Sequence, residues 1–252
     1  KVHQTDAILK AEMKKAASIP SESILFNIDQ KADAIAKSDF DAVLGVFAKV
    51  FDEFCGYYGQ QGYVAKLERD LDEQGLLKKF HTHFEDIAGI SWYEGRERFN
   101  MNRHKIAKAF ARTTDNPEES AEDIIRSYRE DYTLSIEDFA NKVNNYIQKR
   151  EKGFRLNFFV DEVGQYIADN VKLMTNLQTI AESLATKCKG QSWIFVTAQG
   201  DLDKILGRME NQTIEQDGQD VKVDFSKIQA RFKTRMKLTS QNVNKVIEQR
   251  LL

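Results

Sequence analysis

The sequence predicts an α/β fold: a parallel sheet with flanking helices, interrupted by a large all-α insertion. Two short apolar runs, Phe154–Val160 and Trp193–Ala198, are separated by a helical pattern, which is typical of parallel strands buried on both faces. A third run, Ser23–Asp29, lies far upstream. The helical block between Ser23–Asp29 and Phe154–Val160 is too long for an ordinary crossover. We therefore expect one α/β core formed by residues 1–32 and 150–252, with residues 33–149 inserted into it.

Spacing, capping and turn signals support several elements of this scheme. Ser135 and Asp138 have the spacing of a capping box ahead of an apolar face, which predicts a helix start at this point. Asp217–Gly218 is the dipeptide favoured in a tight hairpin turn, so Thr213–Val223 predicts a β-hairpin. Helices are also expected over Phe225–Phe232 and after Ser240. The aromatic residues of the insertion are expected to form its core: Phe80, Phe84, Trp92, Tyr93 and Phe99.

Composition excludes several classes of protein. The chain has 252 residues, of which 41% are hydrophobic and 30% charged, a balance typical of globular proteins. No apolar run approaches the roughly 20 residues of a membrane helix, and the N-terminus lacks the features of a signal peptide. Cys55 and Cys188 lie far apart and form no ligand pair, while His81 and His83 point to different faces of a predicted helix. We expect a cytoplasmic protein without a membrane partner or a zinc site.

The net charge of −2 conceals an uneven distribution of charge. Between Asp115 and Asp138 there are nine acids and two bases, which we interpret as a solvated face. Between Val221 and Arg250 there are eight bases and two acids. This basic stretch is a candidate surface for nucleic acid or for an acidic partner.

The segment Arg155–Glu162, RLNFFVDE, has the pattern of a Walker B strand. A buried strand carries its terminal carboxylates to the carboxyl edge of the sheet, where open α/β folds bind ligands. Asp161 is the candidate Mg²⁺ residue, acting through water, and Glu162 the candidate for orienting the attacking water. The alternative is that any buried strand can end in acids for solubility.

Two further elements have the order expected of a nucleotide site. Polar residues follow the next strand in WIFVTAQ, so Thr197 and Gln199 are candidates for the sensor 1 role at a γ-phosphate or its attacking water. The segment KIQARFKTRMKL offers Arg231, and after it Arg235, as an arginine finger for the nucleotide of a neighbouring subunit. The alternative for these arginines is a basic face that binds solvent or acidic partners.

Four segments together resemble the large P-loop ATPase of BREX phage-resistance systems, the BrxC/PglY family, which is AAA+-like: FNIDQKAD, RLNFFVDEVGQYIADN, SWIFVTAQGDLDKIL and FSKIQARFKTRMKLTSQNVNKVIEQRLL. The resemblance implies ATP and Mg²⁺ as cofactors and a role in bacterial antiviral defence. It also implies other BREX components as partners, including a DNA methyltransferase, with DNA and further copies of the chain as additional candidates.

One departure from this family limits the hypothesis. The Walker A motif GxxxxGK[ST] should precede the strand at Ile24, and no segment matches it; in GYYGQQGYVAK the spacing is wrong and Leu67 replaces Ser or Thr. We therefore expect an internal fragment of a larger ATPase, which alone binds ATP poorly and tends to associate. The main alternative is a non-enzymatic module that binds DNA or a partner through residues 221–250. A third is a degenerate ATPase scaffold, against which the presence of Glu162 argues.

Overall fold

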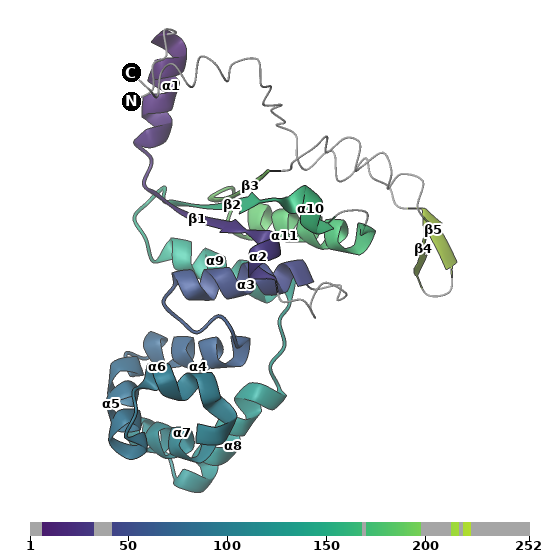
Figure 1. Cartoon of the computed structure of the whole chain (residues 1–252). Coiled ribbons are helices and arrows are strands. Elements are labelled where there is room, and N and C mark those ends of the chain that lie inside the picture. The colour runs from purple at the N-terminus through teal and green to yellow at the C-terminus, as the bar shows by residue number, and fades with distance from the viewer. Residues whose placement is uncertain (1–6, 33–41, 168–169, 198–212, 217–218, 223–252) are drawn as a thin grey trace, which may run out of the picture.

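The computed structural model describes residues 7–32, 42–167, 170–197, 213–216 and 219–222 (Figure 1). The elements, in chain order, are α1 (Ala7–Ala17), β1 (Ser21–Asn27), α2 (Ile28–Lys31), α3 (Ala42–Phe54), α4 (Gly62–Glu73), α5 (Leu77–Ala88), α6 (Trp92–Gly95), α7 (Phe99–Thr114), α8 (Glu118–Glu130), α9 (Ile136–Gln148), β2 (Arg155–Asp161), α10 (Val163–Ile167), α11 (Val171–Lys187), β3 (Ser192–Val196), β4 (Thr213–Gln216) and β5 (Gln219–Lys222). This order confirms an α/β protein that is mostly helical.

The three predicted core strands form one parallel sheet in the order β1-β2-β3. β1 ends at Asn27, two residues earlier than expected, because Asn27 caps α2. Its side-chain oxygen accepts a 3.1 Å hydrogen bond from the backbone N–H of Gln30. This cap turns the chain out of the sheet at its carboxyl edge.

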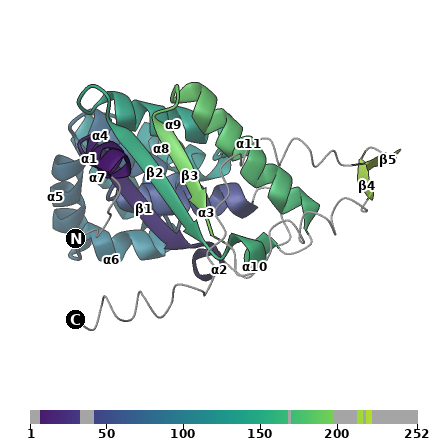
Figure 2. The same cartoon turned by 90° about the horizontal axis from the view of Figure 1, so that it is seen from above.

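The prediction that helices cover both faces of the sheet is wrong for the described residues. α3 and α9 lie against one face, with α11 packed beside them (Figure 1). The other face, seen in front of these helices in Figure 2, exposes four large apolar side chains. They are Leu25 at 77%, Phe159 at 36%, Trp193 at 48% and Phe195 at 42% exposure. The chain steps from β1 to β2 to β3 in one direction, and crossovers of one hand then place every connecting helix on the same side. We call the uncovered side the open face.

The covered face carries the main hydrophobic core. Phe158 of β2 contacts Phe47 and Phe51 of α3 and Phe139 of α9, with ring centroids 5.5–6.5 Å apart. All four rings are fully buried. Although α3 and α9 belong to the long helical region, they share one hydrophobic core with the sheet.

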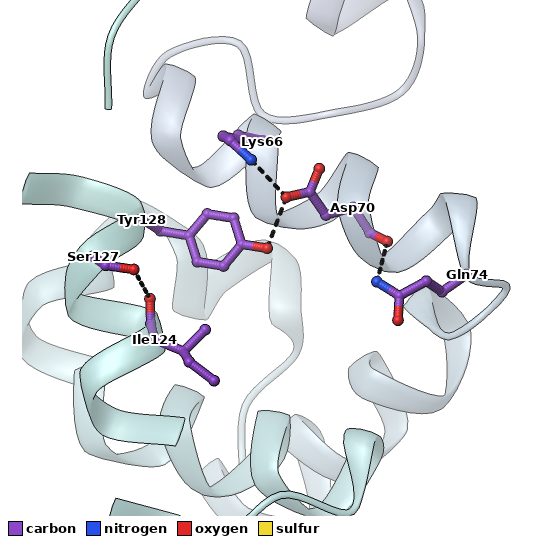
Figure 3. A network of polar contacts seen from close by, with 6 residues as sticks. All are labelled: Lys66, Asp70, Gln74, Ile124, Ser127 and Tyr128. Carbon is purple, nitrogen blue, oxygen red and sulfur yellow. Dashed lines mark hydrogen bonds and ion pairs between the residues drawn. The ribbon is translucent and has the colours of Figure 1, made fainter. Parts of the chain in front are cut away.

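The helices α4 to α8 form a second core that shares none of its buried residues with the first. Of the aromatic residues predicted to lie there, four are buried, whereas Tyr93 is 59% exposed. Figure 3 shows how polar contacts join α4 to α8: the carboxylate of Asp70 accepts hydrogen bonds from Lys66 at 2.7 Å and from the hydroxyl of Tyr128 at 2.8 Å. Burial and the bond to Asp70 raise the pKa of Tyr128 above its ordinary value.

A buried carboxylate joins α4 to the segment that precedes it and to the residues around α6. Glu68 is 2% exposed, and its carboxylate accepts hydrogen bonds from the Trp92 indole at 2.6 Å, from Arg96 at 2.9 Å and from the backbone N–H of Tyr58 at 2.6 Å. Three donors satisfy a charge that would otherwise be costly to bury.

Two further sequence predictions are confirmed, and two others lie outside the described residues. The cap of α9 is confirmed, because the Ser135 side chain accepts a hydrogen bond from the backbone N–H of Asp138 at 3.0 Å. β4 and β5 pair antiparallel and confirm the hairpin, while its turn, Asp217–Gly218, lies outside the described residues. The helices expected over Phe225–Phe232 and after Ser240 also lie outside them.

Candidate functional site

The carboxyl edge of the sheet brings polar residues from all three strands into one row. Asn27 ends β1 and is the register partner of Asp161, which ends β2. Thr197 directly follows β3, and its backbone continues the ladder: its N–H donates to the carbonyl of Val160 and its carbonyl accepts from Val163, both at 3.0 Å. The row Asn27–Asp161–Thr197 therefore follows from strand register rather than from loop conformation.

Two of the predicted site residues are in direct contact. The Thr197 hydroxyl donates a hydrogen bond to the carboxylate of Asp161. The same carboxylate oxygen accepts the backbone N–H of Glu162 at 3.0 Å, and that N–H also lies 3.4 Å from the Thr197 hydroxyl oxygen. Asp161 is exposed, so these bonds orient a carboxylate that still faces solvent.

Glu162 adopts an uncommon backbone conformation. Its φ of 59° lies in the left-handed region, which costs a residue with a side chain about 1–2 kcal/mol. α10 begins immediately afterwards, with the Tyr166 N–H donating to the Glu162 carbonyl at 3.1 Å. The half-buried side chain reaches β1, where it accepts a 2.9 Å hydrogen bond from the Asn27 amide. Strained conformations of this kind cluster at functional sites.

Asn27 is a member of the site that the sequence interpretation missed. It donates to Glu162 through Nδ2 and accepts from Gln30 through Oδ1, so both ends of its amide are used. The available signal was its place near the end of a predicted strand, in FNID, close to where the carboxyl edge of the sheet was expected.

The donor set suits a hard divalent cation better than zinc. No cluster of three or more His, Cys, Asp and Glu that could hold a metal occurs in the part of the chain that the structure describes. Asp161 and the Thr197 hydroxyl supply oxygen atoms only. Mg²⁺ keeps several waters and typically binds through one or two carboxylates together with substrate phosphates.

The structure does not describe the remaining predicted site residues. Gln199, Arg231 and Arg235 all lie outside the described residues, so their roles stay predictions. The histidines do not form a site together. His81 stacks on Trp92 with centroids 6.1 Å apart, whereas Nδ1 of His83 lies 3.0 Å from the Thr113 hydroxyl.

Within the described ranges, no helix has the length and apolar character needed to cross a membrane.

Comparison with known proteins does not identify a family for this chain. No protein-family model matches the chain, and no solved structure matches it significantly.

Proposed function

We propose that the chain supplies the Walker B and sensor 1 elements of an AAA+-like P-loop ATPase of the BREX phage-defence type. The observation that carries the proposal is the contact between Asp161 and Thr197 at the carboxyl edge, beside the strained Glu162. The sequence alone predicts these three residues for one nucleotide site, on the ends of two adjacent strands. Their proximity supports that assignment.

Each residue has a distinct part in this proposal. Asp161 would hold Mg²⁺ through its water shell, and the bound ion would neutralise charge on the phosphates. Glu162 would orient the attacking water and accept its proton, while Asn27 holds the Glu162 carboxylate in place through the 2.9 Å bond. Thr197 would fix the orientation of Asp161 and sense the γ-phosphate. Gln199, and Arg231 or Arg235 from a neighbouring copy, would complete the site.

The phosphate cradle must come from a separate Walker A element, since the sequence contains no GxxxxGK[ST] motif. A P-loop surrounds the phosphates with consecutive backbone N–H groups at a helix N-terminus. This chain would thus supply half of a nucleotide site. The site would become able to hydrolyse ATP in a cytoplasmic homo-oligomer that works with other BREX components, including a DNA methyltransferase. The second candidate function, a DNA- or partner-binding module, rests on the eight bases between Val221 and Arg250.

The decisive test uses a polypeptide that contains both this chain and a Walker A element. Glu162→Gln should abolish ATP hydrolysis while ATP binding persists, whereas Asp161→Asn should weaken Mg²⁺-dependent binding. Glu151→Gln, an exposed acid before the opposite end of β2, is the matched control and should leave both unchanged. Hydrolysis that persists in Glu162→Gln would contradict the assigned role, and tight Mg²⁺-dependent ATP binding by the 252-residue chain alone would contradict the half-site.

A further inference from the structure

The open face of the sheet has a composition that differs from a face designed for helix packing. Strand register arranges its residues in rows across the sheet: Ser21 and Arg155, then Ser23, Asn157 and Trp193, then Leu25, Phe159 and Phe195, and finally Asn27, Asp161 and Thr197. Only the third row is wholly apolar. Faces covered by helices in parallel sheets are near-continuously apolar, as the covered face is here.

Three aromatic rings on this face form a nearly parallel series. Phe159 and Phe195 stack with centroids 4.6 Å apart and planes 9° apart, and Trp193 follows Phe195 at 6.2 Å and 15°. All three rings are between 36% and 48% exposed. Exposed aromatic rings on a sheet are a platform on which nucleobases stack, independently of their sequence.

Arg155 places a positive charge at the amino end of the same face. Its guanidinium lies 5.9 Å from the centroid of the Trp193 ring, and no described acidic side chain forms an ion pair with it. Lys152 and Lys189 are exposed in the loops before β2 and β3, and they too lack an acidic partner among the described residues. The carboxylates of Asp161 and Glu162 lie at the opposite end of the strands, whereas the loop before β2 carries both Lys152 and the exposed acid Glu151.

We propose that the open face binds single-stranded nucleic acid. Unpaired bases stack on the ring faces that Trp193, Phe195 and Phe159 do not use against one another, and the phosphates lie towards Arg155. Single strands are favoured over duplexes because only unpaired bases expose their faces for stacking. The side chains of Ser23 and Asn157 have no described hydrogen-bond partner and can bond to base edges. None of the stacking residues belongs to the carboxyl-edge row, so loss of nucleic-acid binding in their variants can be distinguished from loss of ATP hydrolysis.

The test measures binding of the purified chain to fluorescein-labelled dT20 and U20 by anisotropy, at low salt and with increasing salt. Phe195→Ala and Trp193→Ala should each weaken binding about 5- to 100-fold. Arg155→Gln should weaken it and reduce the salt slope by about one. Tyr93→Ala is the matched control, because Tyr93 is 59% exposed and also lies beside an arginine, Arg96, at 4.7 Å. The relative affinities for dT20 and U20 distinguish DNA from RNA.

Leucine variants distinguish nucleic acid from a protein occupant. Phe195→Leu and Trp193→Leu keep an apolar surface that a helix or a second copy could cover, but they remove the π-face that stacks a base. Binding of dT20 or U20 should fall in both, with circular dichroism and Tm unchanged. No binding at low salt, or equal affinity in every variant, would overturn the proposal. Self-association that the alanine variants abolish and the leucine variants retain, with unchanged nucleic-acid binding, would show a protein interface instead.

Discussion

The side-chain amide of Asn27 donates a 2.9 Å hydrogen bond to the carboxylate of Glu162, joining residues 135 positions apart in the chain. The bond links the ends of two neighbouring parallel strands and holds the side chain of a residue whose backbone is left-handed. It therefore couples a helix cap, a strand register and a strained turn at one edge of the sheet.

Substitutions of Asn27 should distinguish the contributions of its two side-chain hydrogen bonds, one to Glu162 and one from Gln30. Asn27→Ala removes both the cap of α2 and the donor to Glu162, so we expect a loss of about 1–2 kcal/mol in the free energy of unfolding. Asn27→Asp keeps a capping oxygen but places a carboxylate beside Glu162. In the polypeptide with a Walker A element, it should reduce ATP hydrolysis. Urea denaturation and phosphate release measure the two effects; unchanged hydrolysis in Asn27→Asp would contradict a positioning role.

Glycine at position 162 should stabilise the chain and remove its proposed activity. Glu162→Gly relieves the left-handed strain, which we expect to raise the free energy of unfolding by up to about 1 kcal/mol, less the lost bond to Asn27. Asp115→Gly is the matched control, because Asp115 has a similar φ of 56° at the end of α7 and no part in the site. Chemical denaturation should show a gain in Asp115→Gly, and also in Glu162→Gly when it is made in an Asn27→Ala background, where the bond between the two side chains is already absent. Hydrolysis should be lost only in the variants at positions 162 and 27; a destabilising effect of Glu162→Gly in that background would contradict stored strain.

Acid should destabilise the helical unit through His81. Burial is the main cause that lowers the pKa of His81, with Arg96 adding to the effect and Glu68 opposing it. A folded-state pKa below the ordinary value of about 6.5 means that the unfolded chain binds the extra proton first. Stability should therefore fall as pH decreases below about 6.5. Denaturation at pH 5 and pH 7 should show a smaller difference for His81→Phe than for the wild type; equal differences would contradict this cause.

Removing Arg96 should be far more damaging than removing an exposed arginine. Arg96 pairs with the buried Glu68 at 2.9 Å, and its own side chain is 17% exposed. Arg96→Met leaves that carboxylate with only the Trp92 and Tyr58 donors, so we expect a loss of about 3–5 kcal/mol. Arg126→Met, which breaks an ion pair with the exposed Asp123, should cost at most about 1 kcal/mol. Similar losses in the two variants, measured by thermal and chemical denaturation, would contradict a special role for the buried group.

The sequence correctly predicts where the strands of the parallel sheet lie, but it does not predict which face of the sheet the helices cover. The apolar runs around Ile24, Phe158 and Ile194 located all three strands, because continuous apolar residues select a parallel sheet. The same runs predicted burial on both faces, but Phe159 and Phe195 are exposed. Apolar character alone does not specify crossover direction, which determines the covered side.

The site was predictable where adjacent residues carried the signal. Asp161, Glu162 and Thr197 were identified from strand ends, and the strand register brings them together. Asn27 was missed because its partner is distant in sequence and its side chain also has an ordinary capping role. The contribution of Gln199, Arg231 and Arg235 remains a prediction.

The pairing of β1 with β2 also determines the order in which the chain can fold. Among the described residues, the sheet partners of residues 21–27 are residues 155–161, so this pairing forms only after the helical region between them has been synthesised. The unit α4–α8 has its own core of contacts close in sequence and can form first. Once folded, it shortens the effective loop between α3 and α9 and lowers the entropy cost of closing the sheet. Mutations that weaken the Glu68 cluster should therefore slow assembly of the sheet, although they lie in the other core.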